Sequence, residues 1–420
     1  MFFSTHLPPS RFRGSATLIR LFPILPILWT SFLRPAPALP PISPDLEDAF
    51  QTTDAFAEVD HVVQHHIDLG NLPGAVVLVG HHDAVVLEKA YGNRSVEPEI
   101  EAMTSETVFD LASLTKVVAT APSVMLLVQK GRLKLDDPVS KYLPAFGQVG
   151  KKKVTLRQLL VHYSGMPADL RQTRRRRITS KNALSRIYQA RLVAPPGQRF
   201  IYSDLGFVTL GKVVEKVTGQ SLARFAQENL FSPLGMASTG FLPGLEVIPN
   251  IAPTERLKEG GMLRGQVHDP LASKLGGIAG DAGLFSTARD LARFCQMFLQ
   301  HGSLNGVEIL RPDSVALMTS PQSPEGKPDI RGFGWDIQST YSSVKGSFFS
   351  ATSYGHTGYT GTSLWIDPET QTFLIILTNR VHPDGKGNVK ELRTELANIV
   401  GRRFQPDKLP TADVTGTQQP

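Results

Sequence analysis

Two short segments place a serine three residues before a lysine, Ser113 to Lys116 and Ser342 to Lys345. On a helix, positions i and i+3 share a face, so the hydroxyl and the amine can meet. A serine hydroxyl becomes an effective nucleophile when a neighbouring base takes its proton. A lysine can be that base if burial or nearby cations lower its pKa. The spacing alone does not choose between the two serines.

The surroundings favour the first pair. Ser113 follows the mostly apolar run Phe109-Asp-Leu-Ala112, which would desolvate the amine of Lys116. The second pair lies in a Ser/Gly-rich stretch with no helical pattern, so its side chains need not meet. A third serine, in Gly219-Gln-Ser-Leu-Ala223, approaches the nucleophile-elbow pattern but lies within a helical pattern rather than after a strand. We therefore predict that Ser113 is the nucleophile and Lys116 its base.

Two further segments could complete such a site. Tyr202-Ser203-Asp204 offers a tyrosine that can shuttle protons if local positive charge favours its phenolate. The segment Gly355-His-Thr-Gly-Tyr-Thr-Gly361 leads into a strand, whose edge can present a backbone N–H to a developing oxyanion. Within it, His356 and Thr357 could hold a substrate carboxylate. Taken singly, an isolated tyrosine that packs its ring and a Gly-rich turn would be the simpler interpretations.

The basic character of the chain is local. The net charge is +6 and the isoelectric point about 9.3. Four arginines precede the first acidic residue, and another four form the run Arg174–Arg177. This distribution does not indicate a nucleic-acid partner. A solvated loop is the favoured interpretation of the arginine run, and contact with an anionic wall polymer or lipid surface is the alternative.

The N-terminus has the pattern of an export signal. Arg11, Arg13 and Arg20 precede an apolar stretch from Leu21 to Leu33, and Ala36-Pro37-Ala38 resembles a small-residue cleavage site. The apolar stretch is too short to span a bilayer as a helix. We predict export to the periplasm or the extracellular space. Arg34 interrupts the pattern, so retention of residues 1–38 as a membrane anchor is the alternative.

Hydrophobic periodicity predicts strands near both ends of the chain and helices between them. Strands are expected at 75–79, 84–87, 362–367 and 372–378, and helices at 45–69, 116–131, 156–162, 181–192, 205–218, 221–231, 287–300 and 389–404. The simplest arrangement is a sheet built from the two chain ends with a helical lobe inserted in the middle. The site would then lie in a cleft between the two parts.

This pattern divides the chain into four parts. Residues 1–38 are the signal or anchor, 39–47 a Pro-rich linker, 48–404 the hydrolase domain with its helical lobe at about 117–275, and 405–420 a disordered tail. The single cysteine, Cys295, excludes an internal disulfide and falls at helical spacing among apolar residues, so a buried structural thiol is expected.

The order of these motifs resembles the serine β-lactamase and penicillin-binding-protein superfamily, especially its class C branch and related DD-peptidases and esterases. The chain contains S-x-x-K at Ser113, Y-x-(N/D) at Tyr202 and (K/H)-T-G at His356. The likeness extends from about Asp45 to Phe404 and includes four longer runs: 103–116, 154–167, 200–207 and 275–286. It implies an α/β (α+β) fold, in which an antiparallel sheet is flanked by helices and carries an inserted, mainly helical lobe.

The resemblance also implies roles. Ser113 would be acylated, Lys116 would deprotonate it alone or with Tyr202, and Tyr202 would pass a proton to the leaving group. The backbone N–H groups of Ser113 and Tyr359 would form the oxyanion hole. A further set of residues would bind the substrate: Asp204, His356, Thr357 and Gly358. No metal or cofactor is implied, and the expected partner is a small molecule or a peptidoglycan peptide.

Two departures from the family pattern bear on the substrate. His356 replaces the lysine of β-lactamases, and a neutral imidazole would give a weaker, pH-dependent grip on a carboxylate. Asp204 replaces the usual asparagine, and an ionised carboxylate accepts hydrogen bonds but cannot donate one to a substrate amide. Both changes favour a peptidase or an esterase over an efficient β-lactamase. The W-x-G motif of many related esterases is absent, which favours the peptidase.

Four functions therefore remain open from the sequence. The leading one is a D-alanyl-D-alanine carboxypeptidase-like serine hydrolase that also turns over some β-lactams or esters. The others are a class C-type β-lactamase, a short-chain carboxylesterase, and a non-catalytic penicillin-binding sensor or scaffold. All catalytic positions are filled, which argues against the last.

Overall fold

The protein was examined as a computed structural model, which describes Met1, residues 56–170 and residues 178–405. The helices and strands described below all lie within the unit Ala36–Pro420. Several predictions fall outside the described residues: the export signal or anchor, the linker, the start of the first helix, the run Arg174–Arg177 and all but the first residue of the tail.

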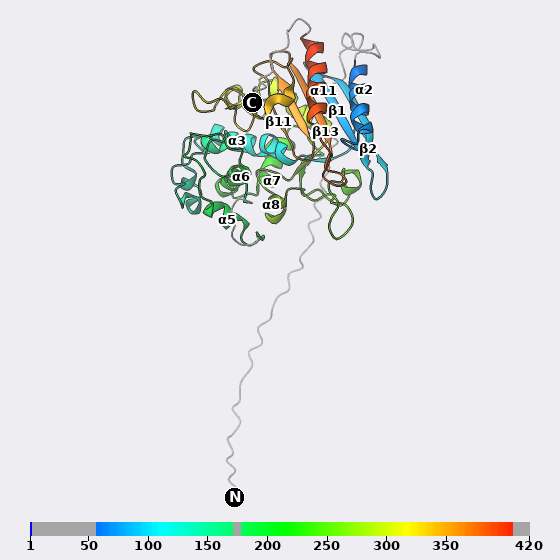
Figure 1. Cartoon of the computed structure of the whole chain (residues 1–420). Coiled ribbons are helices and arrows are strands. Elements are labelled where there is room, and N and C mark those ends of the chain that lie inside the picture. Colours follow the sequence, from blue (N-terminus) through cyan, green and yellow to red (C-terminus); the bar gives the residue numbers. More distant parts are fainter. Residues whose placement is uncertain (2–55, 171–177, 406–420) are drawn as a thin grey trace, which may run out of the picture. The chain divides into compact units, whose positions relative to one another are not determined.

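An antiparallel sheet of eight strands forms the centre of the fold (Figure 1), in the order β3-β2-β1-β13-β12-β11-β10-β9. The strands are β1 (Gly74–His81), β2 (Ala84–Ser95), β3 (Glu101–Ala102), β9 (Ile330–Arg331), β10 (Asp336–Gln338), β11 (Tyr354–Thr357), β12 (Ser363–Asp367) and β13 (Thr372–Thr378). Strand β1 pairs with β13 so that Val77 lies opposite Ile376. The two ends of the chain therefore build one sheet, as predicted.

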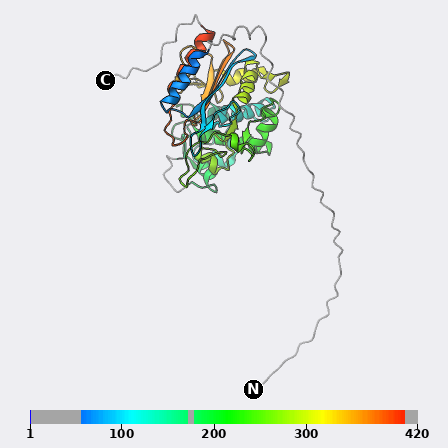
Figure 2. The same cartoon turned by 90° about the vertical axis from the view of Figure 1, so that its right-hand side faces the viewer.

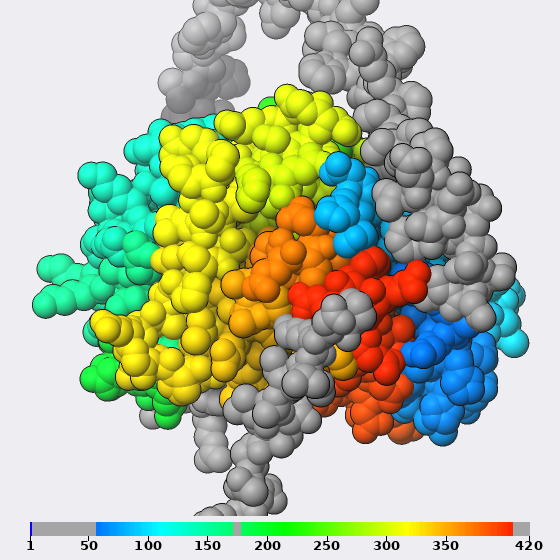
Figure 3. Space-filling model, turned by 90° about the horizontal axis from the view of Figure 1, so that it is seen from above, coloured from blue at the N-terminus to red at the C-terminus, as the bar shows by residue number. Residues whose placement is uncertain are grey.

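Helices α2 (Ala57–Asp68) and α11 (Lys390–Phe404) cover one face of this sheet. Figure 2 shows them side by side, and Figure 3 shows them adjoining at the surface. Successive residues of a strand point to opposite faces. Accordingly Val77 packs with α2 and α11, whereas its neighbours Val76 and Leu78 pack into the larger core on the other face. Because both faces are buried, β1 is a continuous apolar run.

The opposite face carries α9 (Ala288–Leu299) and, beyond it, the helical part of the chain. The other α-helices are α3 (Ala121–Gln129), α4 (Leu156–Leu160), α5 (Ala183–Gln189), α6 (Asp204–Thr218), α7 (Leu222–Ala226), α8 (Pro270–Lys274) and α10 (Pro312–Thr319). The described residues also contain two π-helices, η2 (Lys116–Thr120) and η5 (Gln227–Phe231). The first begins the predicted helix 116–131, which continues as α3, and the second ends the predicted helix 221–231, which begins as α7. Cys295 is fully buried in α9, as expected.

Short elements complete the fold and were not predicted. A small sheet of β4 (Phe109–Asp110), β6 (Leu284–Ser286) and β5 (Gly240–Phe241) joins the segment before Ser113 to the chain before α9. Strands β7 (Ser303–Leu304) and β8 (Val307–Glu308) form a hairpin. The 3-10 helices are η1 (Ala112–Leu114), η3 (Val139–Lys141), η4 (Pro144–Gly147), η6 (Ile248–Asn250) and η7 (Ser342–Lys345). Elements of two to four residues carry too little periodicity for the sequence to show them.

Within residues 56–170 and 178–405, one helical stretch, Ala112–Gln129, is long and apolar enough to cross a membrane. However, 83% of it is buried inside the protein, as in the core helix of a globular domain. Its apolar character therefore serves packing.

Candidate active site

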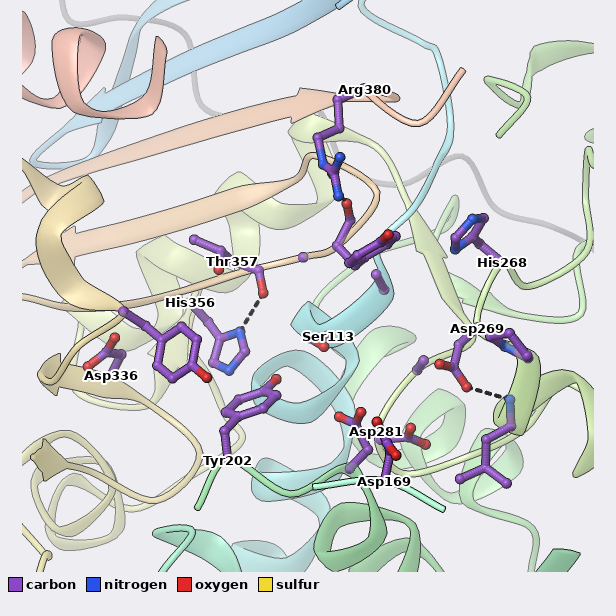
Figure 4. Close-up of a pocket in the computed structure, with 18 of the residues that line it drawn as sticks. Ser113, Asp169, Tyr202, His268, Asp269, Asp281, Asp336, His356, Thr357 and Arg380 are labelled. Atoms are coloured by element: carbon purple, nitrogen blue, oxygen red, sulfur yellow. Dashed lines mark hydrogen bonds between the residues drawn. The ribbon is translucent and has the colours of Figure 1, made fainter. Parts of the chain in front are cut away.

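A cavity of about 580 Å³ opens where the end of β11 meets the helical part of the chain. Its size suits a small organic ligand. Figure 4 shows Ser113 in its middle, with His356 and Tyr202 on one side and several carboxylates on the other. The sequence motifs therefore meet in one place, although they come from three distant segments.

Ser113 lies in the one-turn helix η1, directly after a residue with an unusual backbone conformation. Ala112 has φ of +47°, a left-handed conformation that costs a non-glycine residue about 1 kcal/mol. The Asp110 side chain holds this turn, because its Oδ1 accepts the Ala112 N–H at 2.8 Å while its Oδ2 accepts the His268 N–H at 2.7 Å. Asp110 thus fixes the nucleophile segment to the loop before α8.

Lys116 begins the π-helix η2, and its side chain is fully buried. A π-helical turn within a helix is frequent at functional sites. The ammonium Nζ lies 2.9 Å from Ser113 Oγ, 2.8 Å from Asp204 Oδ1 and 3.0 Å from the backbone oxygen of Asp281. Each of the three N–H donors of Lys116 therefore has an acceptor.

The protonation of Lys116 differs from the prediction. Burial acts to lower the pKa of Lys116, but the carboxylate of Asp204, followed by Tyr202 and Asp281, outweighs it, and the pKa is raised above its usual value. The expected lowering of this pKa is therefore wrong for the free protein. The physical reason is the negative charge of Asp204, which an asparagine at the same position would not supply. In the resting state Lys116 is an ammonium that donates to Ser113 Oγ.

Helix α6 positions Tyr202 and Asp204 at its N-terminus. Ser203 caps this helix, because its Oγ accepts the Gly206 N–H at 3.2 Å, and Asp204 is the first helical residue. The Tyr202 ring lies beside the catalytic pair, with its centroid 5.0 Å from Lys116 Nζ. Burial raises the pKa of Tyr202, and the opposing effect of Lys116 is too small to reverse it. The predicted phenolate is therefore disfavoured, and Tyr202 is a neutral phenol in the resting state.

His162, which the sequence analysis did not single out, packs against Tyr202. The His162 ring lies 4.5 Å from the Tyr202 ring between centroids, and its Nδ1 accepts the Ser203 N–H at 2.9 Å. His162 is buried with φ of +61°. Burial, followed by the charges of Arg331 and Lys116, lowers the pKa of His162 well below its usual value, so the ring is neutral. The sequence signal that could have indicated His162 is its position after two apolar residues and before Tyr163, in the family-like run 154–167.

The segment Gly358–Thr362 is fastened to the residues before Ser113. Thr360 Oγ1 donates to the Asp110 oxygen at 2.7 Å, and Thr362 Oγ1 donates to the Leu111 oxygen at 3.0 Å. A Cβ at Gly358 would lie 2.6 Å from the Leu111 oxygen, so only glycine permits this approach. Among the described residues, neither the Ser113 N–H nor the Tyr359 N–H has an acceptor. Both remain available to an oxyanion.

His356 is buried and its orientation argues against the predicted contact with a carboxylate. Its Nδ1 lies 2.8 Å from the Thr357 carbonyl oxygen, which can only accept, so we assign the proton to Nδ1. Burial, then Arg331 and Lys116, lowers the pKa of His356 well below its usual value. The buried Nε2 is therefore an acceptor near neutral pH and cannot donate to a carboxylate. The hydroxyl of Thr357 can still donate a hydrogen bond to one.

The guanidinium groups of Arg380 and Arg393, which were not predicted from the sequence, line the cavity next to the segment Gly358–Thr362. Arg380 donates to the Tyr359 oxygen at 2.9 Å. Arg393, on α11, donates to the oxygens of Gly358 and Thr362 at 3.1 and 2.8 Å. Burial, then the charge of Arg380, lowers the pKa of Arg393 to about 9. Both groups hold the loop that carries Tyr359 and place positive charge beside it.

The second serine–lysine pair does not form a site. Contrary to the expectation of no helix, Ser342–Lys345 forms the 3-10 helix η7. Nevertheless, Ser342 Oγ donates to the Ser339 oxygen, and Lys345 Nζ donates to the Ile337 oxygen at 3.0 Å. The hydroxyl and the amine therefore serve local structure, and Ser113 is the serine placed beside its lysine.

Comparison with known proteins agrees with this arrangement. The family model described as Beta-lactamase matches residues 59–398. The chain belongs to the beta-lactamase family. This family assignment covers the sheet, the helical lobe and every residue of the site.

Relatives of this beta-lactamase family protein include a protein of Escherichia coli (strain K12) named "Putative D-alanyl-D-alanine carboxypeptidase". It is 32% identical over 382 residues, covering 82% of this chain and 86% of that protein. Among solved structures, EstCE1, a hydrolase with promiscuous acyltransferase activity, has a TM-score of 0.69 at 25% identity and covers 84% of this chain and 100% of its own. The octameric penicillin-binding protein homologue from Pyrococcus abyssi has a TM-score of 0.66 at 26% identity, with coverages of 83% and 78%.

The ion pair between Lys116 and Asp204 predicts how the acylation rate of this protein depends on pH. In Asp204→Asn the pKa of Lys116 should fall, because the carboxylate that raises it is gone. Each unit of fall increases the neutral fraction about tenfold. We expect the acid limb of the acylation rate against pH to move to lower pH, and the rate near neutral pH to rise about tenfold.

The measurement is the pH profile of acylation by a fluorescent penicillin. Asp137→Asn is the matched control, since Asp137 pairs with Lys141 at 2.8 Å outside the cavity. The control should keep the wild-type profile. An acid limb of Asp204→Asn that coincides with wild type would contradict the role assigned to Asp204.

Proposed function

We propose that this protein is an exported serine hydrolase of D-alanyl-D-alanine-type peptides that works through an acyl-enzyme on Ser113. The observation that carries the proposal is the contact of Lys116 Nζ with Ser113 Oγ at 2.9 Å in a cavity beside two guanidinium groups. A peptide that ends in a free carboxylate matches this arrangement, because Thr357, Arg380 and Arg393 supply donors and positive charge on one side of the nucleophile.

The reaction follows from the positions of the groups. Once Lys116 has lost its proton to solvent, Ser113 Oγ attacks the carbonyl carbon of the penultimate residue, and its proton passes to Lys116 Nζ and on to Tyr202. The new Oγ–C bond gives a tetrahedral oxyanion, which the N–H groups of Ser113 and Tyr359 stabilise. The C–N bond then breaks, and Tyr202 delivers the proton to the leaving amine. Water attacks the resulting ester by the reverse proton path and regenerates Ser113.

Substrate binding can activate Lys116. The carboxylate of Asp204 holds the resting ammonium, and its side chain is 31% exposed at the cavity. An amide N–H of the acyl part of the substrate can donate to this carboxylate. Such a bond would weaken the hold of Asp204 on Lys116 and lower the pKa of the amine. Deprotonation of Ser113 is then coupled to occupation of the site by a peptide.

Export is the second part of the proposal. It rests on the basic lead, apolar stretch and small-residue segment of residues 1–38, a pattern typical of secretory signals. Export would bring the enzyme to peptidoglycan peptides. Fractionation of cells that express the full chain tests it, because a protein found only in the cytosol would contradict export.

One experiment tests the activity directly. Purified protein is labelled with fluorescent penicillin, and release of the label is followed beside hydrolysis of a D-Ala-D-Ala peptide, nitrocefin and a p-nitrophenyl ester. The proposal expects labelling of Ser113, slow release and release of D-alanine from the peptide. Ester hydrolysis without peptide cleavage would make the protein an esterase, rapid loss of nitrocefin a β-lactamase, and permanent label without turnover a sensor.

A further inference from the structure

A second feature of the cavity is its acidic wall, which we define as Asp169, Asp204, Asp269 and Asp281. Figure 4 shows that three of them, Asp169, Asp269 and Asp281, lie on the side of Ser113 away from His356 and Thr357. The catalytic arrangement uses only Asp204, through its ion pair with Lys116. The carboxyl groups of the other three have no part in the proposed reaction.

Within this wall, the side chain of Asp281 has no ion pair with another described residue, whereas Asp204 pairs with Lys116. Its side chain lines the cavity although the residue is only 1% exposed, and within the described part of the chain its buried Oδ1 has no hydrogen-bond partner. A buried carboxylate oxygen without a donor is costly. Burial, followed by Asp269 and Asp204, raises the pKa of Asp281 well above its usual value. An arriving donor with positive charge would relieve this cost.

The other groups of the wall do not supply that charge. Asp269 Oδ1 accepts the N–H groups of Leu271 and Ala272 at 2.9 and 2.7 Å. Neither Asp269 nor Asp281 forms an ion pair with another described residue. Lys274 borders the cavity, where its Nζ approaches the Pro270 oxygen at 3.4 Å.

The surroundings of the carboxylates indicate which cation fits. Leu170, Ile178 and Leu271 also line the cavity, so it offers apolar surface as well as carboxyl oxygens. Within the described residues, no group of three or more His, Cys, Asp or Glu could hold a metal ion. A primary ammonium on a short alkyl chain matches both features, since it brings three N–H donors and an apolar stem.

We propose that Asp269 and Asp281 form a subsite for a primary ammonium group on the acyl part of the substrate. The position follows from the leaving-group carboxylate, which Thr357 and the two arginines would hold on the other side of Ser113. The preferred substrate is then an acyl donor with a free amine near the scissile bond. This inference rests on the proposed acyl-enzyme chemistry of Ser113 and adds a substrate class to it.

Matched pairs of probes test the subsite. Ampicillin has an amino group where benzylpenicillin has a hydrogen, and D-alanine p-nitrophenyl ester has an amino group where p-nitrophenyl isobutyrate has a methyl group. For each pair, the ammonium preference is the ratio of the acylation or kcat/KM values. We expect Asp281→Asn to lower this ratio about tenfold, because a hydrogen-bonded charge pair is lost. Asp269→Asn should lower it in the same direction.

Two variants control for structural damage. Lys274→Met removes a positive charge at the edge of the same wall and should raise the ratio. Asp336→Asn makes the same chemical change in a buried carboxylate 3.5 Å from Arg331, on the side of Ser113 where His356 lies, and should leave the ratio unchanged. If Asp281→Asn does not fold, the other two variants still test the subsite. The ratio should fall in Asp269→Asn and rise in Lys274→Met.

The failure of the subsite and the failure of the proposed function are separable. Equal ratios in wild type, Asp281→Asn and Asp269→Asn, with Ser113 still acylated, would overturn the ammonium subsite. If Ser113 is not acylated by any probe, the proposed function fails instead. Calorimetric binding of ampicillin and benzylpenicillin to Ser113→Ala then decides the subsite, because it requires no reaction. Equal affinities there would also overturn it.

Discussion

Replacing Ser113 with alanine is expected to abolish labelling by penicillin and to lower hydrolysis of every substrate by about 10⁴-fold or more. Alanine removes the only atom that forms the acyl bond, whereas the cavity, the oxyanion N–H groups and Lys116 stay in place. The loss should therefore appear in kcat, with substrate binding largely retained. Labelling followed by mass spectrometry and steady-state kinetics are the measurements.

The chain offers a matched control for this variant. Ser342 begins the second S-x-x-K, but its hydroxyl bonds to Ser339 rather than to a lysine. Ser342→Ala should keep wild-type labelling and turnover. If Ser113→Ala retained full activity on all substrates, the nucleophile assignment and the whole mechanism would be wrong.

Replacing Lys116 with methionine is expected to lower the acylation rate by about 10³-fold. The methionine fills a similar volume but cannot accept the proton of Ser113 or hold Asp204. Lys116→Arg separates these two functions, because a guanidinium keeps the positive charge beside Asp204 but does not give up its proton. We expect Lys116→Arg to be as slow as Lys116→Met in stopped-flow acylation.

The alternative outcome for Lys116 is equally informative. An active Lys116→Arg variant would show that only the charge at this position matters and that Tyr202 alone carries the proton. Lys345→Met is the control, since Lys345 bonds to the Ile337 oxygen outside the reaction path. It should retain the wild-type rate. Circular dichroism checks that each variant folds, because Lys116 is fully buried.

The sheet was predictable because its main strands have strong local signals. Residues 74–80 are apolar and buried on both faces of the sheet, and Thr372–Thr378 coincides with the predicted strand. Strands β9 and β10 were not predicted, because two or three residues show no periodicity. Their neighbours in space, rather than their own sequence, make them strands.

The helical lobe was also visible in outline. Helix α6 begins one residue before its predicted start because Ser203 caps it and Asp204 is the first helical residue. The long prediction over Lys116–Gly131 is correct in position, but its first turn is π-helical. Hydrophobic spacing does not distinguish these turns, since the difference is set by contacts of Lys116 and Thr120 with Asp281 and Gly280.

The order of three motifs in the sequence, with the resemblance to the serine β-lactamase and penicillin-binding-protein superfamily that they carry, was enough to single out Ser113, Lys116, Tyr202 and the His356 segment as one site. Tertiary structure decided the charges within it. Asp204 keeps Lys116 protonated, burial keeps Tyr202 and His356 neutral, and Arg393 and Asp281 arrive from segments without a motif. A pKa depends on burial and on neighbours that are close in space, and spacing along the chain contains neither.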